Sequence, residues 1–300
     1  MKRKSLILSV IAFIAAVFGA QAQEMPATYI QRPIVPDSIS TLAGRCNYVA
    51  DHFFDFCDLK KAFSSRARMG DEIRTYLEIL PQASPERAQA AASRLMEQLA
   101  KQPADQLYVA TLAEEAYYSD SAAAWYDRLY LPFASAVADN KKIQRAEKAR
   151  FVRQAKVLEG SLIGSKVAPL EYVTPSGERR NLDMDNAEAV LVMLADPTCS
   201  DCSMARLRLD ADASLRELVD EGRFKVVVIG IADPADPEWQ AKAAEMPSSW
   251  TVGANPDVDT LWDMRVSGPS LFIFDRKHNL RWKHLTTDMV LDIARQIKKR

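Results

Sequence analysis

Apolar residues recur at intervals of three and four through residues 38–158, which is the spacing of helices that bury one face. The predicted helices cover residues 38–54, 71–80, 84–101, 104–118, 122–138 and 143–158. Ser84 can cap the third of these helices, and Pro85 suits its first helical position. The pattern therefore predicts an all-α N-terminal domain over residues 23–158.

Aromatic residues of this helical region follow the same spacing as its aliphatic residues. We expect them to fill the core rather than to form a platform for a ligand. They are Tyr117, Tyr118, Trp125, Tyr126, Tyr130 and Phe133, and the first predicted helix adds Leu42, Tyr48, Val49, Phe53 and Phe54 as expected core positions.

A different pattern follows a predicted linker at residues 159–163. Compact apolar runs predict buried central strands at residues 190–194, 225–231 and 271–274, with helical patterns between them at 204–220, 238–245 and 258–264. The remaining segments are a strand over 168–173, a turn at 174–177, an edge strand over 279–285 and a last helix over 287–298. This alternation predicts an α/β domain over residues 164–300, with a central mixed sheet flanked by helices.

The first 22 residues have the pattern of a secretory signal peptide. Basic residues at positions 2–4 precede an apolar run from Leu6 to Ala20, and a small-x-small cleavage pattern ends at Ala22. The run is too short for a membrane span. We expect the mature chain to begin at Gln23, to have no membrane span and to reside in the bacterial periplasm.

Cleavage at this point would remove three positive and no negative residues, and so would change the formal net charge from −1 to −4. A mildly acidic surface argues against nucleic acids and anionic membranes as partners. The chain has 4 cysteines, too few for a scaffold held together by disulfides, although an oxidising compartment permits individual bonds.

Cys199 and Cys202 directly follow the predicted strand at 190–194 and open a helix that we expect to extend to Asp220. A thiol at a helix N-terminus meets unpaired N–H groups and the positive end of the helix dipole. Both favour the thiolate, so the thiol pKa should fall below its free value of about 8.5. Residues three apart share a helix face and can form an intramolecular disulfide.

Two other interpretations of this cysteine pair stay open. A structural disulfide that never turns over would fit the same local geometry. A zinc site would need two more ligands, and the remaining cysteines and histidines do not pair at the usual ligand spacing. These candidates are Cys46, Cys57, His52, His278 and His284. We therefore expect no metal and no cofactor.

Gly268 and Pro269 stand just before the predicted strand at 271–274. A proline at the start of a buried strand calls for an explanation, because it cannot donate to the ladder. A cis bond before Pro269 would make a tight turn and present the backbone of Gly268 to an extended substrate chain. An ordinary trans proline is the commoner alternative, since only about 5–6% of X–Pro bonds are cis.

Residues 164–300 resemble a thioredoxin-like domain of the periplasmic TlpA/ResA type of thiol-disulfide oxidoreductase. The matching pieces are the Ala168-Pro169 lead strand, the turn at 174–177, the Cys199-Ser200-Asp201-Cys202 motif and Pro269. The resemblance implies that Cys199 attacks a substrate disulfide and that Cys202 resolves the mixed disulfide. It also implies that Pro269 is cis and faces the pair. The helical region resembles a domain of unknown function that precedes such domains in exported bacterial proteins.

The sequence departs from the thioredoxin pattern at three places. Asp196-Pro197-Thr198 stands where thioredoxins usually carry Trp before the first cysteine. The strand at 190–194 lacks the buried acid that helps to move the resolving proton, so Asp196 or Asp201 would have to serve. Gly268 provides no side chain beside the proline. These departures leave the direction of electron flow open.

Cys46 and Cys57 form a separate problem. On one unbroken helix they would lie roughly 16 Å apart, too far for a disulfide. A bond becomes possible only if the helix ends near Phe54 and the chain turns back. We expect two buried free thiols, which are common in proteins.

The main hypothesis is an exported thiol-disulfide oxidoreductase whose catalytic residues are Cys199 and Cys202 and whose substrate-binding groove is shaped by Gly268 and Pro269. Its partners would be protein thiols or disulfides, with a membrane electron donor if it acts as a reductase. The alternative hypothesis is a redox-inert thioredoxin-like scaffold whose helical half recognises a partner.

Overall fold

The computed structural model describes residues 29–184 and 187–299, and the predicted signal peptide at 1–22 lies outside these ranges. The chain divides into two compact units, one up to Ala155 and one from Lys156 onwards. Within the described ranges, no helix has both the length and the apolar character that a membrane crossing requires.

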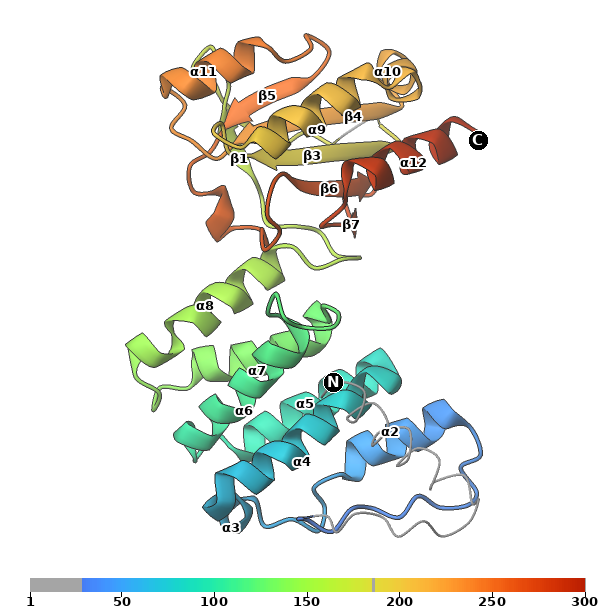
Figure 1. Cartoon of the computed structure of the whole chain (residues 1–300), viewed down its shortest axis with the longest axis vertical. Coiled ribbons are helices and arrows are strands. Elements are labelled where there is room, and N and C mark those ends of the chain that lie inside the picture. The colour runs from blue at the N-terminus through green and yellow to red at the C-terminus, as the bar shows by residue number, and fades with distance from the viewer. Residues whose placement is uncertain (1–28, 185–186, 300) are drawn as a thin grey trace. The chain divides into compact units, whose positions relative to one another are not determined.

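The first unit is helical, as predicted (Figure 1). Its helices are α2 (Leu42–His52), α3 (Leu59–Ala62), α4 (Arg66–Ile79), α5 (Pro85–Gln98), α6 (Pro103–Tyr117) and α7 (Asp127–Asp139), and α8 (Arg145–Gly160) begins in it. Pro103 starts α6, since a helix needs no N–H donor at its first position. Ser84 is the N-cap of α5 but makes no side-chain cap, and its N–H instead donates to Asn47 Oδ1 at 2.7 Å.

The predicted helix over 122–138 begins only at Asp127. Residues 119–126 form a loop instead, and several hydrogen bonds hold it, among them the following two. The Trp125 indole N–H donates to the Ser119 carbonyl, and the Tyr126 N–H donates to the Tyr117 carbonyl, both at 3.1 Å. These bonds satisfy backbone and indole polar groups within the loop. Residues 122–126 therefore stay in the loop and do not form the first turns of α7.

The core of the helical unit contains five of the eleven expected residues, and Tyr48, Phe54, Tyr118 and Trp125 are only partly buried. Tyr117, Tyr130 and Phe133 are buried, as are Val49 and Phe53. Two expectations are wrong: Leu42 is 46% exposed because it starts α2 on the outer side, and Tyr126 is 41% exposed in the loop. The core is thus built from facing stripes of the helices, as the apolar spacing predicts.

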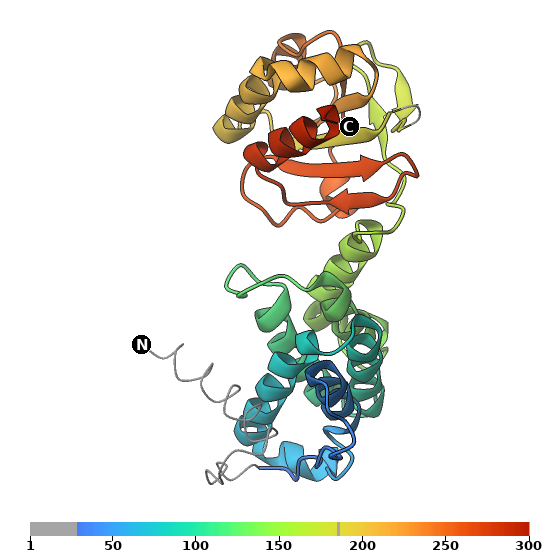
Figure 2. The ribbon, with the colours of Figure 1, turned by 90° about the vertical axis from the view of Figure 1, so that its right-hand side faces the viewer.

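The second unit contains one mixed sheet of seven strands in the order β2-β1-β5-β4-β3-β6-β7. The strands are β1 (Glu171–Val173), β2 (Arg179–Asn181), β3 (Ala189–Ala195), β4 (Phe224–Gly230), β5 (Thr251–Ala254), β6 (Ser270–Asp275) and β7 (Leu280–Trp282). The central strand β3 pairs parallel with β4 and antiparallel with β6. Figure 2 shows β6 and β7 as a hairpin at one edge of the sheet.

Both faces of the central strands are buried, which explains their continuous apolar sequence. On one face Leu191 and Met193 pack with the helices α9 (Ser200–Ala211), α10 (Ala213–Asp220), α11 (Pro237–Ala244) and α12 (Thr287–Lys298). On the other face Val192 and Leu194 pack with Trp262 and Phe272. The predicted α/β domain with a mixed sheet flanked by helices is confirmed.

Three local predictions in this unit need correction. The helix expected over 204–220 is two helices, because the Asp212 carboxylate accepts the Leu215 N–H at 2.9 Å and starts α10 afresh. The expected helix over 258–264 is a single 3-10 turn at Val258–Thr260. Strands β2 and β5 were not predicted: β2 is wholly exposed, and β5 lacks an apolar run.

Candidate functional site

The predicted cysteine pair lies at the junction between β3 and α9. Strand β3 ends at Ala195, and Cys199 is the N-cap of α9, with Cys202 in its first turn. The two residues form a disulfide with their Cα atoms 5.3 Å apart. The Cys199 sulfur also accepts the backbone N–H of Cys202 at 3.1 Å. A thiolate at this position would receive the same hydrogen bond and the field of the helix N-terminus.

The two cysteines differ in their exposure. Cys202 is 4% exposed and packs in the core between the sheet and its helices. Cys199 is only partly buried and lies at the rim of the same core. A reagent or a protein disulfide can therefore reach Cys199, whereas Cys202 is accessible mainly through Cys199.

The turn before Cys199 is fixed by its own side chains. The Thr198 N–H and hydroxyl both donate to the Asp196 carboxylate, at 2.7 and 2.6 Å, and the Cys199 N–H donates to the Asp196 carbonyl at 3.1 Å. Asp196 thus shapes the loop that presents Cys199. Asp196 and Asp201, the two acids considered for proton transfer, are both exposed to solvent.

Gly268 and Pro269 lie at the same edge of the sheet as the cysteine pair. Strand β6 begins at Ser270, which is opposite Leu194 near the end of β3. A Cβ atom built on Gly268 would lie 3.5 Å from Asp201 Cβ, between the two cysteines in sequence. The segments at 199–202 and 268–269 therefore meet, although they are far apart in sequence.

The cis bond that the resemblance implies before Pro269 is not observed. No peptide bond in the described part of the chain is cis, so Pro269 is trans here. The chain instead turns at Gly268, whose φ of 86° lies in the left-handed region that glycine enters without a steric cost. Gly268 rather than a cis proline thus produces the turn in this structure.

A buried cluster of charged residues adjoins this loop, and it was missed in the sequence. Asp263 is 1% exposed, and its carboxylate accepts hydrogen bonds from Lys283 Nζ at 2.8 Å and from the Arg265 guanidinium. His284 Nε2 lies 3.0 Å from the same carboxylate. The Asp263 N–H donates to Ser161 Oγ at 2.9 Å, so the backbone of Asp263, together with its carboxylate, holds the start of the 264–269 loop against the rest of its unit.

Burial by itself would raise the pKa of Asp263. The hydrogen bond to His284 and the positive charges of Lys283 and Arg265 outweigh that effect and hold the pKa of Asp263 well below its ordinary range. The only sequence sign of this cluster is an acid inside the apolar stretch Leu261-Trp262-Asp263-Met264.

The remaining cysteines are free thiols, as expected: Cys46 is buried in α2, and Cys57 is partly buried in the loop after it. Burial, together with the negative charges of Asp58 and Glu72, raises the pKa of Cys57 to about 11. Burial also raises the pKa of Cys46. Both are therefore poor nucleophiles at neutral pH.

The chain is similar to known proteins in both its sequence and its structure. A family model described as a domain of unknown function, DUF5106, matches residues 16–160. No curated protein matches the sequence. The structure is similar to the crystal structure of a thioredoxin-like protein from Bacteroides caccae, with a TM-score of 0.67 and 19% identity over 90% of this chain and 99% of that chain. The sheet-containing unit therefore has a thioredoxin-like fold.

Two further solved structures match shorter parts of the chain. A conserved protein of unknown function from Bacteroides fragilis has 28% identity and a TM-score of 0.41 over 44% of this chain and 98% of that chain. The thioredoxin domain of a thiol-disulfide oxidoreductase from Bacteroides vulgatus has 21% identity and a TM-score of 0.38 over 45% of this chain and 96% of that chain.

The charge cluster yields a prediction for stability. We expect Asp263→Asn to lower the free energy of unfolding by about 3–5 kcal/mol, because the buried Lys283 would lose the negative charge of the carboxylate 2.8 Å from its Nζ. Urea unfolding of the full chain can be followed by tryptophan fluorescence, since Trp239, Trp250, Trp262 and Trp282 report on the sheet-containing unit. Asp292→Asn is the control, and removing its exposed pair with Arg295 should cost less than about 1 kcal/mol.

The difference in the free energy of unfolding between the wild type and Asp263→Asn should also depend on pH. Because the pKa of Asp263 is lower in the folded state, its contribution is complete above the unfolded value of about 3.9 and is lost as pH falls below it. The difference should therefore shrink between about pH 4 and pH 2. A difference that stays constant over this range would contradict the role given to the ionised carboxylate.

Proposed function

We propose that this protein is an exported thiol-disulfide oxidoreductase of the TlpA/ResA type, which exchanges disulfides with substrate proteins through Cys199 and Cys202. The observation that supports the proposal most strongly is the arrangement of the pair. The accessible sulfur is at the N-terminus of α9, its partner is buried one turn further along, and the Gly268 backbone lies beside them. A purely structural disulfide would not require this difference in exposure.

In the reductive direction, the Cys199 thiolate attacks one sulfur of a substrate disulfide. The substrate disulfide breaks, one substrate sulfur leaves as a thiolate, and a mixed disulfide joins Cys199 to the other. The helix N-terminus favours the attacking thiolate over the thiol. The Cys202 N–H, 3.1 Å from the Cys199 sulfur, supplies a hydrogen bond to it.

Cys202 then resolves the mixed disulfide. It loses its proton and attacks the Cys199 sulfur, the second substrate sulfur leaves as a thiolate, and the Cys199–Cys202 disulfide forms. Two electrons have passed from this pair to the substrate. The structure describes the oxidised pair that results. A dithiol donor, supplied at the membrane, would have to return the electrons, and oxidation of a substrate dithiol is the same sequence in reverse.

Gly268 and Pro269 would form the floor of the substrate groove in this scheme. The left-handed turn at Gly268 brings backbone rather than a side chain next to Asp201. An extended substrate chain could pair with that backbone and place its disulfide above Cys199. Export through the N-terminal signal pattern, with the mature chain in the periplasm, belongs to the same proposal, since only an oxidising compartment supplies stable protein disulfides.

The first test is a trapping experiment with the full chain and insulin as a defined disulfide substrate. After reduction, Cys202→Ser should accumulate a mixed disulfide with insulin at a level about tenfold above Cys199→Ser, because only the resolving step is lost. Mass spectrometry without reductant measures the product. Cys57→Ser is the matched control and should behave as the wild type, since the pKa of Cys57 is raised to about 11.

In the reduced wild-type chain, iodoacetamide at neutral pH should label Cys199 before Cys202. The opposite order would assign the roles the other way round. Equal inertness of both thiols, with no trapped insulin, would favour the redox-inert scaffold.

A second test concerns the groove. Gly268→Ala would place a methyl group 3.5 Å from Asp201 Cβ and strain a left-handed backbone by about 1–2 kcal/mol. We expect it to slow insulin reduction on the order of tenfold by displacing the docked chain, with little change in iodoacetamide labelling of Cys199.

Gly222→Ala is the control for backbone strain in this test. Gly222 also has a positive φ, of 70°, but no atom lies within 4 Å of its added methyl group. The Gly222→Ala variant should lose about as much stability as Gly268→Ala but should keep its insulin-reducing activity. Equal loss of activity in both variants would show that Gly268 has no specific role in the substrate groove.

A further inference from the structure

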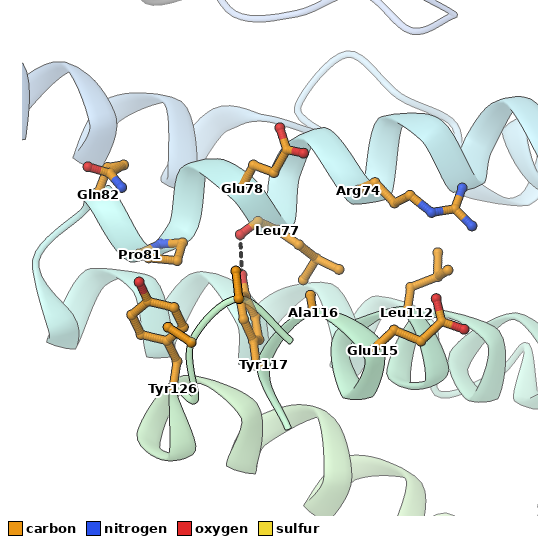
Figure 3. Close-up of a pocket in the computed structure, with 12 residues that line it drawn as sticks. Arg74, Leu77, Glu78, Pro81, Gln82, Leu112, Glu115, Ala116, Tyr117 and Tyr126 are labelled. Carbon is orange, nitrogen blue, oxygen red and sulfur yellow. Dashed lines mark hydrogen bonds between the residues drawn. The ribbon is translucent and has the colours of Figure 1, made fainter. Parts of the chain in front are cut away.

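The helical unit has a cavity of its own, with a volume of about 540 Å³ (Figure 3). This is within the usual range for small-molecule sites, about 300–1,000 Å³. The cavity lies between one face of α4, with the turn after it, and one face of α6, and the 119–126 loop closes one side. All of its lining residues belong to the helical unit, and none belongs to the unit that carries Cys199 and Cys202.

The spacing of the lining residues shows how the cavity forms. Those from α4 and its continuation are Arg74, Leu77, Glu78, Pro81 and Gln82, and those from α6 are Leu112, Glu115, Ala116 and Tyr117. Positions separated by three and four lie on one helix face. Two helix faces therefore line the cavity, and the small side chains of Ala116, Ala123 and Ala124 leave space there that larger residues would fill.

The cavity has an apolar and aromatic floor. Leu77 and Leu112 are buried beneath it. The rings of Tyr117 and Tyr126 meet edge to face, with their centroids 5.7 Å apart. The Tyr117 hydroxyl donates to the Leu77 carbonyl, which fixes the ring between α4 and α6 (Figure 3). Such a floor suits a hydrocarbon or aromatic group.

The charged groups of the cavity are not balanced. Arg74 already donates to Asp71, at 3.2 Å. Among the described residues, neither Glu78 nor Glu115 has a hydrogen bond or an ion pair through its carboxylate. Glu78 is partly buried, and this burial raises its pKa. Removing water from a carboxylate without supplying a cation is unfavourable, and a bound cation would offset this cost.

We infer that this cavity binds a small apolar molecule that carries a protonated amino group. The apolar body would lie on Leu77, Leu112 and the tyrosine rings, and the ammonium group would pair with Glu78. Tyrosine faces add a favourable interaction with a cation nearby. An anionic ligand is disfavoured, because two carboxylates line the site and its one arginine already has an acidic partner.

Three indole compounds of similar size test the inference, because they share the ring and differ chiefly in the charge of the side-chain end group. Tryptamine carries an ammonium group, tryptophol a hydroxyl and indole-3-propionate a carboxylate. Binding to the full chain at pH 7 is measured by calorimetry and by ligand-observed NMR. We expect tryptamine to bind at least about tenfold more tightly than tryptophol, and indole-3-propionate to bind most weakly.

Variants then locate the site. Glu78→Gln should reduce tryptamine affinity about tenfold and leave tryptophol unchanged, while Glu97→Gln on the exposed face of α5 should change neither. Ala116→Phe should block both ligands by filling the cavity. If Ala116→Phe unfolds the chain, which circular dichroism reports, Glu78→Gln still decides the matter, because the Glu78 carboxylate makes no hydrogen bond or ion pair with the described residues. Equal affinity for tryptamine and tryptophol, or tryptamine binding that Glu78→Gln does not weaken, would overturn the inference.

Discussion

The antiparallel pairing of β3 with β6 brings together the two loops on which the proposed disulfide exchange depends. Six residue pairs, from Ala189–Asp275 to Leu194–Ser270, align the C-terminal end of β3 with the N-terminal end of β6. The loop that leaves β3 carries Cys199, and the loop that enters β6 carries Gly268. A shift of one residue would turn every buried side chain of β6 to the opposite face, so burial on both faces fixes this register and brings the two loops together.

Two hydrogen-bonded carboxylates then fix the two loops of the site. Asp196 shapes the turn before Cys199, and Asp263 anchors the start of the loop that leads to Gly268. Each carboxylate is satisfied by several donors, and in the case of Asp263 these include buried cations. Under the proposed function, a loop anchored this way would present its backbone to a substrate without moving, which would lower the entropy lost on docking.

The sequence allowed the central strands and α12 to be predicted, because residues 190–194, 225–231 and 271–274 are apolar on both faces and residues 287–298 have one apolar face. It did not reveal β5, where Gly253 gives room to the Tyr172 ring, since that packing depends on a neighbour far away in sequence. The apolar spacing on both sides of Asp212 is helical, so a continuous helix was expected and the break at Asp212 was not predicted. The position of the cysteine pair at the start of a helix was predicted, whereas the Asp263 cluster and the cavity at Glu78 arise only from tertiary contacts.

The central claim is that the Cys199–Cys202 bond exchanges rather than merely holds the fold together. The reduction potential of this couple, measured on the full chain in glutathione buffers of known ratio, tests it most directly. A sulfur that is accessible and stabilised as a thiolate at the start of α9 makes the reduced form favourable, so the account predicts a potential above about −300 mV. A potential below about −300 mV would identify a structural bond and contradict the account.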